Sequence, residues 1–295
     1  MFTDKNERGS SMQQKHKDED QKKQIIEEQT TNQVPIGEQI EEGVGDVVEG
    51  AQQEVASARR LWYQSLRWGR ILLVVYAILL ALFALLSWWV FYHPVLAIDV
   101  TITHEFQENQ APWLRFIMLA VSFIGNVTAL SLGLIILAAA LFWIVDLRLE
   151  AAMVVALSAT SAFLNALIKY IVARPRPTSS LVEVIQNAGG NSFPSGHVMS
   201  YIAFWGLLFS FAIILFNGNR WWRTALLIIS GLFVVLVGPS RIYLGDHWAS
   251  DVLGAYLIGG VLLGFALWIY LALKSKGVLA PRGNRARLFH EKYLK

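Results

Sequence analysis

The sequence predicts an all-α integral membrane protein, a bundle of six transmembrane helices preceded by a disordered polar N-terminal tail. Of its 295 residues, 55% are hydrophobic, and the mean hydropathy is +0.44. This composition is too apolar for an ordinary soluble domain. The apolar residues are also clustered, and a helix that crosses a bilayer core needs about 20 of them in succession. Six such runs occur, at 71–92, 127–146, 151–168, 197–216, 224–240 and 252–273.

The first part of the chain has a different composition. Residues 1–58 carry six basic and thirteen acidic side chains, and few aromatic ones. Such a segment buries too little apolar surface to offset the entropy of ordering it, so we expect a disordered cytoplasmic tail. Residues 59–295 are basic, which in so apolar a chain indicates cationic membrane flanks and not a nucleic-acid partner. The absence of cysteine excludes disulfides and thiolate chemistry.

Two further segments adjoin the apolar runs. Residues 59–70 combine four arginines with aromatic residues, and we expect a flank that anchors the first span; an amphipathic helix on an anionic leaflet is the alternative. Between the first two spans, residues 112–126 are apolar but short, which favours an interfacial or partly buried helix. Asp99 in this region is expected to be a solvated loop residue, although it is also a candidate for a substrate entrance. Residues 274–295 form a basic cytoplasmic tail.

The distribution of basic residues predicts the orientation. Most of them lie before the first span, between spans two and three, between spans four and five, and after span six. With six spans, these places share one side, which the positive-inside rule makes cytoplasmic. Both termini are therefore expected in the cytoplasm, with the protein in the plasma (bacterial inner) membrane. Lys169, Arg174, Arg176 and Arg241 lie near outer span ends, against this bias, and require another explanation.

Three polar clusters lie at span ends on this outer side. They read KYIVARPRP at 169–177, PSGH at 194–197 and SRIYLGDHWASD at 240–251. Lys169, Arg176 and Arg241 bring three cations to one region, where unpaired charge is costly. Phosphate would satisfy them, because Arg binds it bidentately and Lys binds it as a point charge. Ser195 and Gly196 begin span four, where unpaired N–H groups and the helix dipole favour an anion, and Ser195 is expected to cap this helix.

Two histidines complete the arrangement. His247 and Asp251 are four residues apart, so on a helix they would share a face and the carboxylate would orient the ring. That geometry suits a nucleophilic imidazole, and His197 is then available to protonate the leaving oxygen. The adjacent Asp246 is read three ways: it raises the pKa of His247, it pairs with Arg241, or it is a solvated carboxylate.

In these motifs the chain resembles the type 2 phosphatidic acid phosphatase superfamily, whose three-part pattern is K-x₆-R-P, P-S-G-H and S-R-x₅-H-x₃-D. All eleven fixed positions are present in order, and the resemblance covers about 71–273, the expected phosphatase domain. It implies that His247 is the nucleophile, oriented by Asp251, and that His197 is the general acid. It further implies a metal-free and cofactor-free site in which phosphate is bound by Lys169, Arg176, Ser195, Gly196 and Arg241. Arg174 is then a headgroup contact or a flank.

The expected function is hydrolysis of a lipid phosphate or diphosphate through a phosphohistidine at the outer face of the membrane. The resemblance suggests undecaprenyl diphosphate, phosphatidic acid or phosphatidylglycerol phosphate as substrate. Two alternatives stay open. One is a lipid phosphotransferase that passes the same phosphoryl group to an alcohol, and the other is a non-catalytic membrane protein. Membrane lipids surround the chain in each case, and no feature of the sequence identifies a protein partner.

Overall fold

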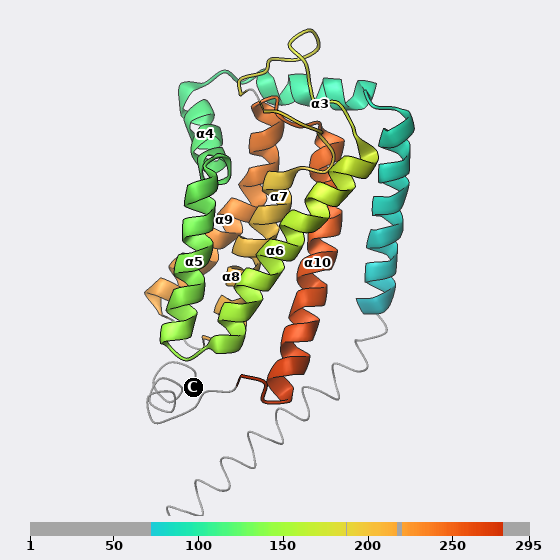
Figure 1. Ribbon diagram of the computed structural model, residues 1–295. Helices are drawn as coiled ribbons and strands as arrows, with labels where there is room; N and C mark the ends of the chain where they lie inside the picture. Colours follow the sequence, from blue (N-terminus) through green and yellow to red (C-terminus); the bar gives the residue numbers. More distant parts are fainter. Residues whose placement is uncertain (1–71, 187, 217–219, 280–295) are drawn as a thin grey trace, which may run out of the picture. The chain divides into compact units, whose positions relative to one another are not determined.

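The structure is a computed structural model that describes residues 72–186, 188–216 and 220–279 (Figure 1). The described residues other than Leu72 belong to one compact unit of the chain, Leu73–Lys295. The predictions made for residues 1–58, 59–70 and 280–295 lie outside the described residues.

All regular secondary structure in the described residues is helical. After the first helix, Leu72–Tyr92, the elements are α3 (Ala97–Gln107), α4 (Pro112–Asn126), α5 (Thr128–Ile144), α6 (Arg148–Val172), α7 (Gly196–Tyr201), η1 (Ile202–Gly206), α8 (Leu207–Ile214), α9 (Trp221–Tyr243) and α10 (Ala249–Ser275). Of these, α7, η1 and α8 form one continuous helix whose middle is a π-helical turn.

The predicted membrane bundle is confirmed. In the described part of the chain, five helices are long and apolar enough to cross a membrane, and there are six if the bent pair α4 and α5 counts as one span. These two helices meet at an angle of 72°, and α5 has only 17 residues. The second predicted span is therefore α5, joined by a bend to the short apolar helix α4 that was expected before it.

One element differs from expectation. The region between the first helix and α4 was expected to be a loop, but it contains α3, an 11-residue helix that runs across one end of the bundle (Figure 1). Three polar side chains of α3 are buried, namely Asp99, Thr103 and Gln107. Because buried polar groups need partners, α3 is a structural part of this end of the molecule.

Small residues allow the central helices to approach closely. A Cβ built on Gly259 of α10 would lie 2.8 Å from Ile202 Cδ1, and one on Gly206 would lie 2.9 Å from Leu263 Cδ2. Glycine at such contacts lets two backbones come near each other, as in many membrane helices. The helix 196–214 is accordingly the most buried span, with 61% of its apolar window inside the protein.

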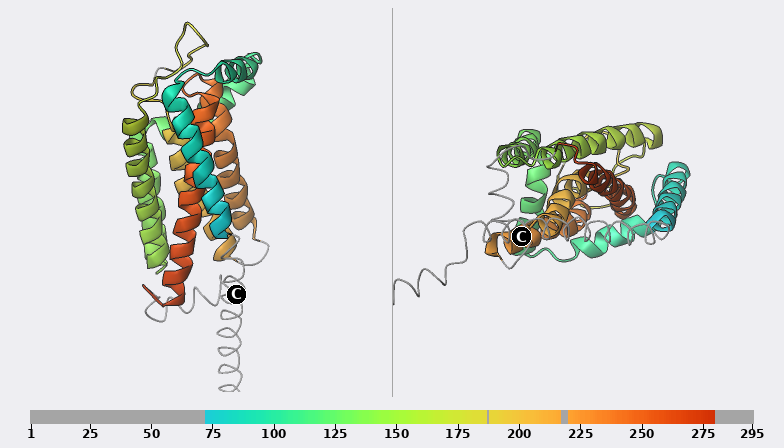
Figure 2. Two further views of the ribbon diagram at one scale, coloured as in Figure 1. Left: turned by 90° about the vertical axis from the view of Figure 1, so that its right-hand side faces the viewer. Right: turned by 90° about the horizontal axis from the view of Figure 1, so that it is seen from below.

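The first helix is much less enclosed. Only 6% of its apolar window is buried, and it stands at the edge of the unit next to α10 (Figure 2). An apolar cleft of about 540 Å³ lies between the two helices. It is lined by Leu82, Leu85, Leu86, Trp88, Trp89, Leu253 and Leu257.

Candidate active site

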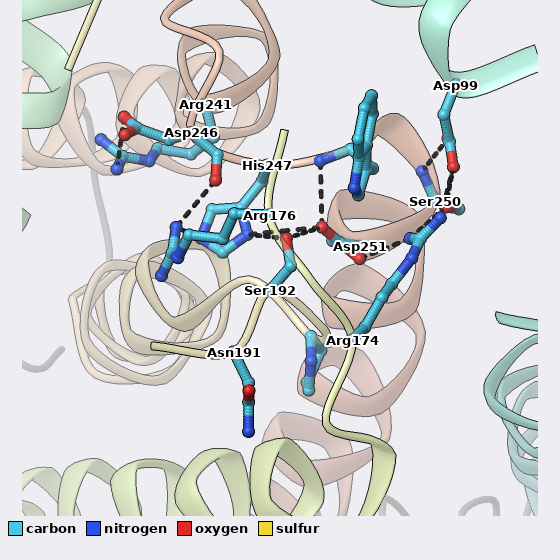
Figure 3. Close-up of polar contacts among 12 residues, drawn as sticks. Asp99, Arg174, Arg176, Asn191, Ser192, Arg241, Asp246, His247, Ser250 and Asp251 are labelled. Atoms are coloured by element: carbon cyan, nitrogen blue, oxygen red, sulfur yellow. Dashed lines mark hydrogen bonds and ion pairs between the residues drawn. The ribbon is translucent and has the colours of Figure 1, made fainter. Parts of the chain in front are cut away.

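The three sequence clusters meet at one end of the bundle. Figure 3 shows residues of the first and third clusters side by side, and the backbone N–H of Ser195 in the second donates to the carbonyl of Asp251 at 3.2 Å. Lys169 lies in the last turn of α6, Gly196 is the first residue of α7, and Arg241 lies in the last turn of α9. His247 lies in the short loop between α9 and α10, and Asp251 lies in the first turn of α10. Residues far apart in the sequence are thus neighbours because their helices end at the same level.

His247 is held at both ring nitrogens. Its Nδ1 lies 3.3 Å from Ser192 Oγ and 3.5 Å from Asp251 Oδ2, whereas its Nε2 lies 3.3 Å from Arg176 Nη1. The side chain is 2% exposed. Burial, reinforced by nearby cations of which Arg176 has the largest effect, lowers the pKa of His247 well below its ordinary value of 6.5. The ring is therefore neutral near pH 7. A proton on Nδ1, facing the carboxylate, leaves a lone pair on Nε2.

The expectation that His247 and Asp251 share a helix face is wrong. α10 begins at Ala249 with Trp248 as its N-cap, so His247 lies outside the helix. The contact arises differently: Asp251 Oδ2 accepts a hydrogen bond from the backbone N–H of Trp248, at 2.9 Å. This capping interaction turns the carboxylate back over the start of the helix, where it reaches the ring of His247.

Two polar partners of Asp251 were not identified from the sequence. Ser192, in the loop before α7, donates a short hydrogen bond from its hydroxyl to Asp251 Oδ2. Arg174 Nη1 lies 2.6 Å from Asp251 Oδ1. The sequence signal for Arg174 was its position in the ARPRP stretch, next to the arginine of the motif; Ser192 had no comparable signal.

The structure also corrects the expectations for Arg174 and Asp99. Arg174 is 1% exposed, so it is neither a headgroup contact nor a surface flank. Asp99 of α3 is equally buried instead of solvated, and its Oδ2 lies 2.7 Å from Arg174 Nη2. Neither the carboxylate nor the guanidinium is accessible to a ligand in this arrangement.

Asp246 pairs with Arg241, as one of its three readings proposed. Its Oδ2 lies 2.6 Å from Arg241 Nη2, and both side chains are buried. Burial raises the pKa of Asp246, and the nearby Arg241 and Arg176 act in the opposite direction. Arg241 also donates a short hydrogen bond to Ser122 Oγ of α4, but its Nε has no hydrogen-bond partner.

The other two cations of the motif have carbonyl partners. Lys169 Nζ donates to the backbone carbonyls of Asn191 and Ser192. Arg176 donates to the carbonyls of Gly189, Gly190 and Asp246. Neither side chain is within ion-pair distance of a carboxylate of the described residues. Both are half-buried, which leaves them accessible to an anion.

Unpartnered polar atoms collect at the start of α7. Ser195 occupies the N-cap position, but its hydroxyl makes no capping hydrogen bond, contrary to expectation, and it has no other partner. His197 Nε2 is buried and also lacks a partner. Gly196 packs against Asn165, whose Oδ1 would lie 3.0 Å from an added Cβ. Buried groups of this kind are costly unless a ligand or water satisfies them.

A compact oxyanion fits these groups better than a metal ion. Within the described ranges there is no group of three or more His, Cys, Asp or Glu side chains able to hold a metal. The arrangement instead offers two cations without carboxylates, a helix start and a hydroxyl donor, all of which suit phosphate. An imidazole with a lone pair adjoins them, so the site can attack a bound phosphoryl group.

Comparison with known proteins agrees with this chemistry. Residues 149–275 match the family described as the PAP2 superfamily. Over this part, which is 127 of its 295 residues, the chain is similar to the PAP2 superfamily. The matched range begins at the start of α6 and contains all eight predicted site residues, from Lys169 to Asp251.

PAP2 relatives are found among membrane lipid phosphatases. Phosphatidylglycerophosphatase B of Bacillus subtilis is 28% identical over 151 residues, which span 51% of this chain and 72% of that protein. Undecaprenyl-diphosphatase BcrC of the same organism is 35% identical over 104 residues, which span 35% of this chain and 48% of that protein. The crystal structure of a transmembrane PAP2 type phosphatidylglycerolphosphate phosphatase from Bacillus subtilis has a TM-score of 0.56 and 25% identity, covering 66% of this chain and 94% of that one. These relatives support a phosphatase activity for this chain.

Proposed function

We propose that the protein is a membrane lipid phosphatase that forms a phosphohistidine on Nε2 of His247. The observation that carries this proposal is the ring's environment. Its Nδ1 faces Ser192 and Asp251, and its Nε2 faces the half-buried cation Arg176. A phosphoryl group bound by Arg176 is thereby within reach of the nitrogen that carries the lone pair.

The first step transfers the phosphoryl group to the enzyme. Nε2 of His247 forms the N–P bond while the P–O bond to the lipid breaks. His197 gives its proton to the leaving oxygen, which departs as an alcohol, or as a monophosphate when the substrate is a diphosphate. The phosphorylated ring is cationic, and Asp251 stabilises it by accepting the Nδ1–H hydrogen bond. Lys169, Arg176, Arg241, Ser195 and the Gly196 amide bind the phosphoryl oxygens.

The second step returns the enzyme to its starting state. Neutral His197 accepts a proton from water, and the oxygen of that water attacks phosphorus. The N–P bond breaks, its electron pair returns to Nε2 of His247, and inorganic phosphate leaves. Each histidine thus ends in the protonation state in which it began. No metal ion takes part, because the cations of the chain neutralise the phosphate charge.

The proposed substrates are lipids of the undecaprenyl diphosphate, phosphatidic acid or phosphatidylglycerol phosphate class. Relatives named for two of these classes support this choice. So does the apolar cleft beside α10, since Leu253 in its wall follows Asp251 by only two residues. A hydrocarbon chain in that cleft would lie close to the level of the phosphate site.

The proposed sidedness follows from the basic residues. We place the protein in a bacterial plasma membrane with both termini in the cytoplasm and the site on the extracytoplasmic side. Arg148 begins α6, and Arg220 and Arg223 lie at the start of α9; these cations are at the end opposite to the site and favour the cytoplasm.

Phosphate release by purified protein in detergent tests the proposal. A panel of prenyl diphosphates and glycerophospholipid phosphates, each with and without EDTA, identifies the preferred substrate and tests metal independence. We expect His247→Ala to abolish release while its melting temperature and insertion stay close to wild type. Near wild-type turnover in that variant would refute the nucleophile assignment. Radiolabel that appears in a second lipid instead of inorganic phosphate would identify a phosphotransferase.

A further inference from the structure

Arg174 and Asp99 form a buried ion pair that takes no part in the steps above. The pair is 2.7 Å long, and its side chains are 0% and 1% exposed. Removing two charges from water is costly, and apolar side chains of similar size often replace such pairs without loss of stability. Stability alone is therefore a weak reason for this pair to exist.

The guanidinium of Arg174 contacts the orienting carboxylate as well. Its Nη1 lies 2.6 Å from Asp251 Oδ1 and 2.7 Å from Ser250 Oγ, and its Nε donates to the carbonyl of Pro94 at 2.8 Å. Oδ1 is thus fixed on the side away from His247 (Figure 3). The other oxygen, Oδ2, is left to face the ring.

Asp99 fixes the far side of the guanidinium. Its Oδ2 accepts hydrogen bonds from Arg174 and from the hydroxyl of Ser250 at 2.6 Å, and its Oδ1 accepts one from the backbone N–H of Ser250 at 2.8 Å. Asp99 belongs to α3, which lies before the range 149–275 that matches the superfamily. A helix outside the matched range therefore completes the surroundings of Asp251.

The charges in this cluster depend on one another. Arg174 lies between two buried carboxylates, Asp99 and Asp251. Its positive charge offsets one of their two negative charges. Without a cation between them, two buried carboxylates disfavour each other's ionised form. A protonated Asp251 would be a poorer acceptor for the Nδ1–H of His247.

We infer that Arg174 is a positioning residue for phosphoryl transfer: with Asp99 as its counter-ion, it keeps Asp251 ionised and its Oδ2 directed at His247. The inference rests on the proposed function, because Arg174 acts only through Asp251 and the ring that Asp251 orients. Arg174 itself does not touch the phosphate.

A double-mutant cycle tests this role. Turnover of the preferred lipid is measured for Arg174→Met, Asp251→Asn and the double variant. Loss of an orienting carboxylate costs about 10⁴-fold in a serine protease. Loss of a residue that orients a metal ligand costs on the order of 10- to 100-fold, and we take that scale for Arg174, which acts through Asp251. We expect Arg174→Met to lower kcat by that factor with KM within about two-fold, and to cause no further loss in the Asp251→Asn background.

The controls separate positioning from simple stabilisation. Arg174→Lys keeps the charge but loses the two-pronged geometry, so we expect it to fold as the wild type does and still to lose kcat. Arg115→Met, at an exposed arginine of α4, should leave kcat unchanged. Losses at Arg174 and Asp251 that multiply in the double variant would overturn the inference, as would a wild-type kcat in Arg174→Lys. Activity in His247→Ala would instead refute the underlying mechanism.

Discussion

Gly125 of α4 lies directly against the proposed general acid. A Cβ built on Gly125 would lie 2.1 Å from His197 Cδ2 and 2.7 Å from His197 Nε2. Carbon atoms in contact are about 3.5 to 4.0 Å apart, so an alanine here forces the imidazole to move by about 1.5 Å. The ring and not the helix must give way, because Cδ2 and Nε2 are at the end of a side chain.

This displacement predicts a specific kinetic loss in Gly125→Ala. A misplacement of about 1 Å of a catalytic group costs about 10²-fold in rate, so we expect kcat for lipid phosphate hydrolysis to fall by at least about that factor. KM should change little, since the cations that bind phosphate are untouched. Alanine favours a helix over glycine by about 1 kcal/mol, so the melting temperature should not fall.

The matched control is Gly133→Ala in α5. No heavy atom lies within 4 Å of a Cβ built there, so kcat should equal that of the wild type. Phosphate release and thermal melting of the purified variants provide the comparison. A Gly125→Ala protein with wild-type kcat would refute the role of His197 as the proton donor, because turnover would then not depend on the position of its imidazole.

Two further predictions concern ionisation and orientation. The pKa of His247 is lowered, so its Nε2 lone pair stays available in mild acid. We therefore expect kcat/KM, corrected for substrate ionisation, to decline only well below pH 6.5. Arg176→Gln removes a cation that lowers this pKa and should move the decline to higher pH. A wild-type decline centred at 6.5 or above would contradict this. The chain has no cysteine, so an impermeant maleimide added to intact cells should label Ser179→Cys and not Ser275→Cys; the reverse pattern would invert the proposed topology.

The sequence predicted the spans because the thickness of the hydrocarbon core sets a minimum length for an apolar helix. A run of apolar residues of that length can be recognised from the sequence alone. The motif residues were recognisable from their spacing and from the shared end at which their helices finish. Asp99 and Arg174 were misread because their burial depends on contacts between residues 75 positions apart. The 11-residue helix α3 is too short to cross a membrane, and polar residues interrupt its apolar ones, so its position over the end of the bundle emerges only from tertiary packing.

The ion pairs of the site distinguish cations that have a carboxylate partner from cations that do not. The two fully buried arginines are matched: Arg174 by Asp99 and Asp251, and Arg241 by Asp246. Lys169 and Arg176, by contrast, are half-buried, and their polar partners among the described side chains and backbone are neutral carbonyls and the ring of His247.

This division has an energetic reason. A buried charge without a counter-charge is destabilising, whereas a half-exposed one keeps part of its hydration. Carboxylates placed beside Lys169 and Arg176 would compete with phosphate for the same donors. The carbonyl partners hold the side chains of these two cations in position without neutralising their charge. The incoming phosphate then supplies the counter-charge. Gly189→Ala keeps the carbonyl that Arg176 contacts, and no heavy atom lies within 4 Å of a Cβ built there. Inhibition by inorganic phosphate should therefore weaken less in Gly189→Ala than in Gly189→Asp, which adds a carboxylate to the same loop.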